Sequence, residues 1–223
     1  MKHEILYQPS FSVARVLLDP GESVRAESGA MVSMSTSVTL NSGMSGGLGK
    51  AIGRLFGGES LFQTTFTATH GPGEVILAPS AMGDILHLEL QGGGLMVTSG
   101  GFLAGSTSLN VETRASLKGF FAGEGLFLMR ILGVGSLLIN TFGAIHPVQL
   151  QPGQTYVVDT GHIVAFDESV SYELTRATRS LLGSFTSGEG IVAKFSGPGI
   201  VYMQTRSPQG FGSYLSRFLP SSS

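Results

Sequence analysis

The chain contains no cysteine, which excludes a disulfide framework, a thiolate nucleophile and any cysteine-based metal centre. It also has no apolar run of the ~20 residues that a membrane-spanning helix requires, since its most apolar stretch lies only between 126 and 139. Residues 1–6 lack the apolar segment of a secretory signal. We therefore expect a protein of a reducing compartment, the cytoplasm.

Charge is also scarce. Only 13% of the 223 residues are charged, and the formal net charge of −2 with 13 Lys and Arg gives no broad positive field. A protein that holds nucleic acid by its phosphates needs such a field, so we expect no nucleic-acid partner. The hydrophobic content of 42% is ample for the core of one domain.

A short phrase recurs at equal intervals. Gly-Glu pairs, each followed two residues later by an apolar pair, place Glu59, Glu124 and Glu189 at matching points of the sequence. A repeat of this kind indicates one structural unit built three times. We predict a single domain of three tandem units, at about 1–83, 84–146 and 147–223, related by pseudo-threefold symmetry.

Strand signals dominate each unit. Runs of β-branched and aromatic residues bounded by glycine and proline predict a hairpin at 60–68 and 74–78. Matching hairpins are predicted at 126–131 with 136–139, and at 191–195 with 200–203. Further strands are predicted at 12–18, 23–26, 31–36, 85–90, 95–98, 108–113, 146–149, 155–158 and 163–166. The fold class is therefore all-β, as a sandwich, barrel or prism.

One short helix is predicted near the C-terminus. Phe211, Tyr214, Leu215, Phe218 and Leu219 recur with helical spacing. This helix is expected to cover a sheet edge or face; the alternative is that it docks on a partner.

No motif predicts catalysis. A phosphate-binding loop around Gly49 and Lys50 fails, because Met44 and Ala51 stand where the pattern needs glycine and Ser or Thr. The five histidines lack the close spacing of metal ligands; they are His3, His70, His87, His146 and His162. We expect no catalytic residue, no cofactor and no metal.

A Ser-His-Asp triad can be composed only on paper. Its members would be Ser28, His162 and Asp159, and no nucleophile-elbow motif supports them. We therefore expect that the protein is not an enzyme.

The repeated carboxylates permit two interpretations. If Glu59, Glu124 and Glu189 converge on a pseudo-threefold axis, they could hold a hard cation. The alternative is that each is a solvated turn residue, because three converging negative charges repel one another.

A basic apolar segment precedes each Gly-Glu pair. We predict that these segments form a membrane-binding or partner-binding surface, with two alternatives: they plug the core or an oligomer interface, or they rim a ligand pocket. The residues concerned are Arg54, Leu55, Phe56, Lys118, Phe120, Phe121, Arg179, Leu181 and Leu182.

Several stretches together resemble a known family. Pro20-Gly21-Glu22 leading to 27–31, the glycine-rich 43–49 followed by 58–62, and 204–208 resemble the family named for altered inheritance of mitochondria, over nearly the full chain. The resemblance implies three repeats similar to the tryptophan RNA-binding attenuation protein subunit, a double-stranded β-helix-like fold, self-association and no established reaction.

We therefore predict a non-enzymatic homo-oligomer, with a trimer favoured, peripheral to the inner face of the membrane. In this hypothesis it acts as a scaffold that presents the basic apolar segments to a membrane surface or protein partner. The alternative is a small-ligand or nucleic-acid binder that uses glycine-rich loops between the units.

Overall fold

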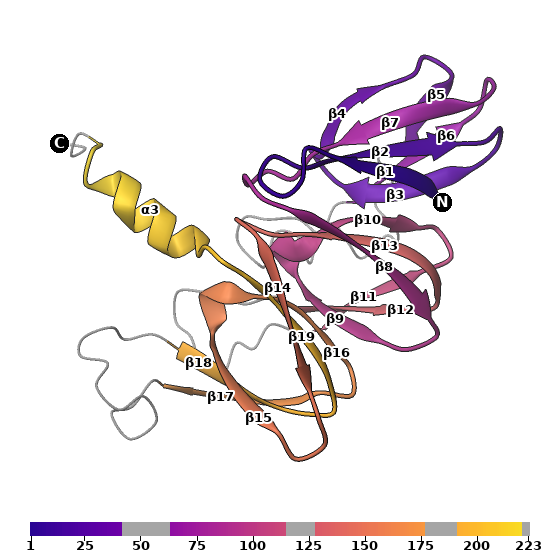
Figure 1. Ribbon diagram of the computed structural model, residues 1–223. Coiled ribbons are helices and arrows are strands. Elements are labelled where there is room, and N and C mark those ends of the chain that lie inside the picture. The colour runs from indigo at the N-terminus through magenta and orange to yellow at the C-terminus, as the bar shows by residue number, and fades with distance from the viewer. Residues whose placement is uncertain (42–62, 115–127, 177–190, 220–223) are drawn as a thin grey trace.

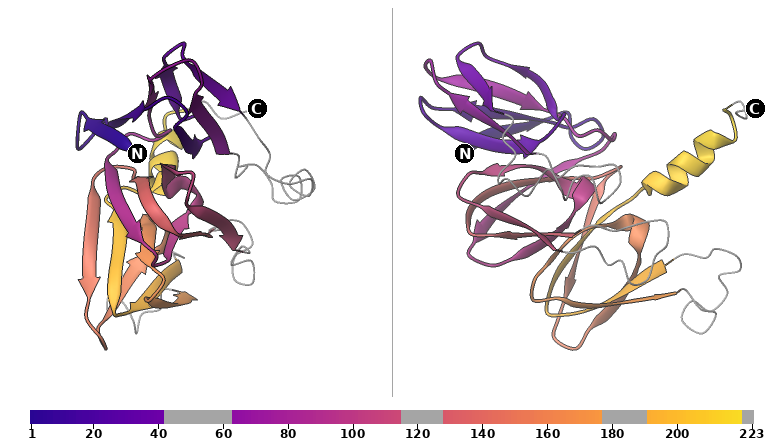
Figure 2. Two further views of the ribbon diagram at one scale, coloured as in Figure 1. Left: turned by 90° about the vertical axis from the view of Figure 1, so that its right-hand side faces the viewer. Right: turned by 180° about the vertical axis from the view of Figure 1, so that it is seen from behind.

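The computed structural model describes residues 1–41, 63–114, 128–176 and 191–219. These residues form antiparallel strands and one helix, which projects from the strands (Figures 1 and 2). Strand β1 spans Lys2–Leu6, and helix α3 spans Pro208–Ser216. An all-β fold with one short C-terminal helix, as predicted, is confirmed.

The other strands fall into three consecutive strand sets. The first set is β2 (Val13–Leu18), β3 (Ser23–Glu27), β4 (Met31–Met34), β5 (Val38–Asn41), β6 (Gln63–Ala68) and β7 (Gly73–Leu77). The second is β8 (Ile85–Gln91), β9 (Leu95–Thr98), β10 (Phe102–Ser106), β11 (Asn110–Arg114), β12 (Leu128–Leu132) and β13 (Val134–Asn140). The third is β14 (Ile145–Leu150), β15 (Thr155–Asp159), β16 (Ile163–Asp167), β17 (Ser171–Arg176), β18 (Ile191–Ser196) and β19 (Gly199–Gln204).

Strand pairing follows the same scheme in each set. The sixth strand lies between the first and third, as in β2–β7–β4, β8–β13–β10 and β14–β19–β16. The fifth strand lies between the second and fourth, as in β3–β6–β5, β9–β12–β11 and β15–β18–β17. Tight turns join the fifth and sixth strands at the predicted hairpins, and Gly71, Gly133 and Gly199 adopt the positive φ values that favour glycine there.

The described strands form four sheets. The first has the order β1-β2-β7-β4, and the fourth has the order β15-β18-β17. The second and third each combine two strand sets, with the orders β5-β6-β3-β10-β13-β8 and β11-β12-β9-β16-β19-β14. The second strand of one set therefore pairs with the third strand of the next.

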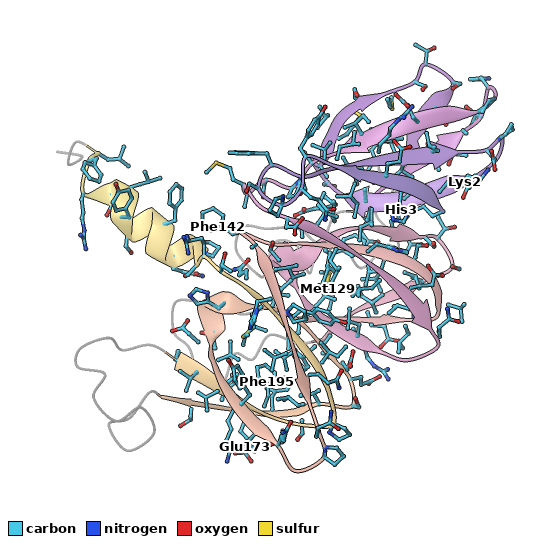
Figure 3. The ribbon with its side chains drawn as sticks, in the orientation of Figure 1. Lys2, His3, Met129, Phe142, Glu173 and Phe195 are labelled. Atoms are coloured by element: carbon cyan, nitrogen blue, oxygen red, sulfur yellow. The ribbon has the colours of Figure 1, made fainter. Side chains whose placement is uncertain are left out.

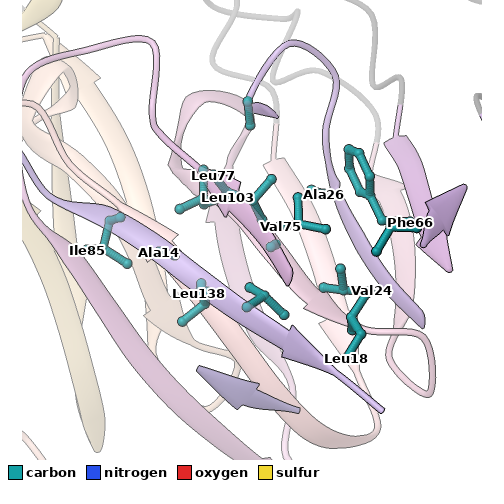
Figure 4. Close-up of a cluster of buried hydrophobic side chains, with 14 of the residues drawn as sticks. Ala14, Leu18, Val24, Ala26, Phe66, Val75, Leu77, Ile85, Leu103 and Leu138 are labelled. Atoms are coloured by element: carbon teal, nitrogen blue, oxygen red, sulfur yellow. The ribbon is translucent and has the colours of Figure 1, made fainter. Parts of the chain in front are cut away.

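Three apolar cores lie between successive sheets. The first core packs Phe66 and Val75 of the first set against Leu103 and Leu138 of the second (Figure 4). Strand β13 contributes side chains to two cores, because successive side chains of a strand point to opposite faces of the sheet. Leu138 joins the first core, while its neighbours Leu137 and Ile139 join the second.

Two details differ from the sequence predictions. Strands β1, β5, β10 and β17 were not among the predicted strands. Helix α3 does not cover a sheet, since none of its residues is buried.

Within the described residues, paired strands join the first set to the second and the second to the third. A closed pseudo-threefold arrangement stays a prediction.

Candidate functional site

The predicted site residues lie outside the described residues. Arg54, Leu55, Phe56 and Glu59 fall in 42–62, Lys118, Phe120, Phe121 and Glu124 in 115–127, and Arg179, Leu181, Leu182 and Glu189 in 177–190. Each of these ranges joins the fourth and fifth strands of its set. The strands are paired close to both ends of each range, through Asn41 with Thr65, Arg114 with Leu128, and Arg176 with Ile191. The three ranges therefore start from equivalent places.

Helix α3 begins at a well-formed cap. Ser207 precedes the helix, and its hydroxyl accepts a hydrogen bond from the Gly210 backbone N–H at 3.3 Å. Pro208 occupies the first turn, where its missing N–H costs nothing. Phe211 contacts Phe142 of the body with ring centroids 5.2 Å apart, which anchors the start of the helix (Figure 3).

Beyond that contact the helix is uncovered. The large apolar side chains of 211–219 are between 38% and 69% exposed; they are Phe211, Tyr214, Leu215, Phe218 and Leu219. Tyr214 and Phe218 pack edge to face with centroids 5.2 Å apart. The two charged residues of 206–223 are Arg206 and Arg217. This segment is thus apolar, aromatic and cationic, and it projects from the β-sheets (Figure 1).

An open groove of about 540 Å³ lies between the β8–β9 and β16–β17 turns. Glycines 93 and 94 line it, together with Glu89, Asp167 and Glu168. Each carboxylate already has a partner: Ser136 donates to Glu89 at 2.7 Å, the Ile200 N–H to Asp167 at 2.8 Å, and Arg130 to Glu168 at 2.6 Å. Three carboxylates disfavour an anionic ligand beside the glycine backbone.

The Ser-His-Asp triad that the sequence analysis considered is not formed in the structure. The Ser28 hydroxyl lies 3.3 Å from the Thr64 hydroxyl, His162 Nδ1 lies 2.7 Å from the Gln204 carbonyl, and Asp159 accepts from the Gly161 N–H. The three side chains therefore serve local contacts. Among the described residues, no group of three or more His, Cys, Asp or Glu side chains could hold a metal ion.

One histidine pair meets between two edge strands. The rings of His3 on β1 and His87 on β8 lie 4.3 Å apart. Burial is the main cause that lowers the pKa of His3. The hydrogen bond with the Met1 carbonyl opposes this lowering; the nearby His87 and N-terminal amine add smaller lowering contributions, and Glu89 opposes them weakly. Sequence spacing could not show this pair, because its members lie on β1 and β8, which are far apart in the sequence.

Two edge strands expose apolar side chains that the sequence analysis did not single out. Met31, Val32 and Met34 on β4 are 38% to 61% exposed, and Tyr156 and Val157 on β15 are about as exposed as Met34. A signal was present, since β4 and β15 contain mostly apolar residues and no Lys or Arg. In the part of the chain that the structure describes, no helix has the length and apolarity of a membrane span.

The chain is similar to proteins of Streptococcus pyogenes. An uncharacterised protein of this organism is 36% identical over 233 positions, covering all of this chain and 93% of that protein. The X-ray crystal structure of a protein of the same species matches with a TM-score of 0.80 at 33% identity, covering 98% of this chain and 99% of that one. The family model described as mitochondrial biogenesis AIM24 matches residues 3–206. This chain therefore belongs to the mitochondrial biogenesis AIM24 family.

Proposed function

We propose that the protein is a non-enzymatic, oligomeric β scaffold of three tandem units that binds an anionic membrane surface. The observation that carries this proposal is helix α3, whose apolar side chains are exposed although the helix is anchored to the body through Phe211 and Phe142. The repeated pairing scheme of the three strand sets supports the tandem units.

The chemistry of α3 fits the membrane interface. Aromatic side chains favour the boundary between headgroups and acyl chains, and cationic side chains are attracted to anionic lipids. Residues 205–223 carry Arg206 and Arg217 and no acidic residue. The predicted basic apolar segments with Arg54, Lys118 and Arg179, which lie outside the described residues, are a second membrane-binding element of this proposal, with the protein at the cytoplasmic face of the membrane.

Flotation with lipid vesicles tests the proposal. We expect the wild type to float with vesicles rich in phosphatidylglycerol and much less with phosphatidylcholine alone. Replacing Tyr214, Leu215 and Phe218 by Ser removes the exposed apolar face, keeps the Phe211 anchor and lowers the partition coefficient about tenfold or more. A matched control is Val134→Ser, which changes an exposed apolar residue at the start of β13.

A second variant separates the helix from the other segments. Replacing Phe56, Phe120 and Leu181 by Ser probes the three basic apolar segments while it keeps α3 intact. If both triple variants float as the wild type does, or if the wild type does not float with anionic vesicles, membrane binding is refuted.

A further inference from the structure

Four linkers of the described chain meet at one end of the strands. Antiparallel pairing places the end of β7 beside the start of β2, the end of β13 beside the start of β8, and the end of β19 beside the start of β14. The linkers that leave these strand ends therefore lie on one side of the molecule. They are residues 7–12 between β1 and β2, 78–84 between β7 and β8, 141–144 between β13 and β14, and 205–207 between β19 and α3.

Backbone hydrogen bonds tie the first three linkers into a row. The Ser12 N–H donates to the Gly83 carbonyl at 3.0 Å, which joins the β1–β2 linker to the β7–β8 linker. The Gly143 N–H donates to the Met82 carbonyl at 2.9 Å, which joins the β7–β8 linker to the β13–β14 linker. These three segments are therefore fixed relative to one another.

The row continues to helix α3. The Arg206 N–H donates to the Phe142 carbonyl at 3.2 Å, and the Phe142 ring contacts Phe211 of the helix. The β1–β2 linker and α3 accordingly lie on the same side of the molecule, seen from the front and from behind (Figures 1 and 2). One flat surface can therefore touch both.

The linkers expose large apolar side chains beside α3. Tyr7 is 73% exposed, Phe11 is 67% exposed and Met82 is 52% exposed. We call these three residues the linker patch. A single exposed apolar residue is ordinary, but these three lie on hydrogen-bonded linkers that lead to the exposed apolar side chains of the helix. An extended apolar surface of this kind marks an interaction site.

The β1–β2 linker turns its polar side chains inward. The Gln8 amide donates to the Asp84 carboxylate and to the Ile85 carbonyl, each at 3.0 Å. The Ser12 hydroxyl donates to the same carboxylate at 3.0 Å, and Asp84 is only 8% exposed. The polar groups of the linker thus satisfy a buried carboxylate, while its aromatic side chains face solvent.

Tyr7 has an unfavourable backbone conformation. Its φ is 61°, and no other non-glycine residue that the structure describes has a positive φ. A bulky residue in this region costs free energy and persists only where the surrounding structure enforces it, often at functional sites. The hydrogen bonds of Gln8 and Ser12 therefore hold Tyr7 in a strained and exposed position.

The charges around the linker patch fit an anionic lipid surface. Residues 7–12, 78–83 and 141–144 contain no charged side chain, and 205–219 contain Arg206 and Arg217 but no acidic residue. Anionic lipids attract cationic side chains and repel carboxylates, and the headgroup region accommodates aromatic side chains. The whole row is thus free of the charge that such a surface disfavours.

We propose that the linker patch is a second membrane-inserting site, so that Tyr7, Phe11 and Met82 enter the headgroup region of an anionic bilayer together with the exposed side of α3. This inference rests on the proposed function, which requires membrane binding but not this patch. Two contacts on one rigid frame strengthen binding, because the second forms within a complex that the first has already made. They also set the orientation, with the linker ends of the strands toward the bilayer.

Single tryptophans test the inserted position directly. The chain has no tryptophan, so Phe11→Trp, Phe218→Trp and Val134→Trp each introduce one reporter. Val134 is 59% exposed at the start of β13, about 20 Å along that strand from the linker that follows it. With vesicles rich in phosphatidylglycerol, we expect blue-shifted emission and quenching by brominated acyl chains at positions 11 and 218, and neither at position 134.

Flotation measures what the patch contributes to binding. Tyr7→Ser combined with Phe11→Ser keeps α3 intact and should lower the partition coefficient about tenfold or more, because two aromatic side chains no longer leave water. Val134→Ser, the control, should float as the wild type does.

Tyr7→Gly separates binding from folding. Glycine adopts a positive φ without strain, so we expect the urea midpoint to be unchanged or raised. The partition coefficient should nevertheless fall severalfold, because the aromatic side chain is absent. A loss of binding without a loss of stability cannot come from unfolding of the linker.

The outcomes distinguish this inference from the proposed function. If the wild type floats but the reporter at position 11 shows neither shift nor quenching, or if the double Ser variant floats equally well, the linker patch is not a membrane site and binding through α3 stands. If the wild type does not float with anionic vesicles, both fail. A blue shift at position 11 that grows with protein concentration in lipid-free buffer would assign the patch to a protein contact and overturn the membrane assignment.

Discussion

Strands β10 and β4 occupy the same place in successive strand sets, yet one is buried and the other is exposed. Each strand has a β-bulge: Leu103 at the bulge of β10 fills the core of the preceding set, while Val32 at the bulge of β4 meets solvent. The local sequences are both apolar. The comparison teaches that burial here depends on whether a neighbouring set is present, and not on the hydrophobicity of the strand itself.

The largest expected effect comes from truncating the buried member of that pair. Leu103→Ala leaves a cavity in the first core, so we expect the free energy of unfolding to fall by about 2–5 kcal/mol. Val32→Ala, measured on monomeric protein, should change it by no more than about 0.5 kcal/mol. Urea denaturation of both variants measures the difference. Equal losses would show that β4 is packed in the monomer as β10 is.

A smaller effect is expected at the junction between the second and third sets. A Cβ added at Gly94 would collide with the Glu168 carboxylate, which Arg130 binds at 2.6 Å. Since an exposed ion pair contributes roughly 0–1 kcal/mol, we expect Gly94→Ala to cost about 1 kcal/mol or less.

Gly93→Ala is the matched control, because nothing lies within 4 Å of the position where its Cβ would stand. It should be neutral or slightly stabilising. Repeating Gly94→Ala in an Arg130→Ala background sharpens the result, since the cost that comes from the ion pair is then absent. An unchanged cost there would assign the effect to the backbone.

The smallest effect concerns pH at the His3–His87 pair. Burial lowers the pKa of His3 below its unfolded value of about 6.5. The unfolded chain therefore binds this proton more readily, so stability present above about pH 6.5 is lost as the pH falls toward the lower folded pKa.

The comparison of urea midpoints at neutral and mildly acidic pH measures this loss. We expect His3→Gln to reduce the pH dependence and His146→Gln, at an exposed histidine, to leave it as in the wild type. The same slope in His3→Gln as in the wild type would exclude His3 as its source.

Much of the strand content was predictable, because β-branched runs between glycine and proline signal strands directly. Strand β10 was missed because Phe102-Leu103-Ala104-Gly105 lacks alternation, being buried on both faces, and follows two glycines. Strands β1 and β17 were missed because they contain charged residues at alternate positions, and charged residues are more typical of loops. The predicted basic segments lie outside the described residues, so the candidate site now rests on α3, whose helical spacing was visible while its exposure was not.

The sequence by itself determined the strand class, the matching hairpins and the amphipathic C-terminal helix, because these depend on local spacing and turn chemistry. Only the tertiary structure decided which apolar strands are covered. A strand of one set completes the sheet of the next, so the burial of a residue depends on a partner strand far away in the chain. Local pattern cannot specify that partner, and at β4 and β15 the described chain supplies none.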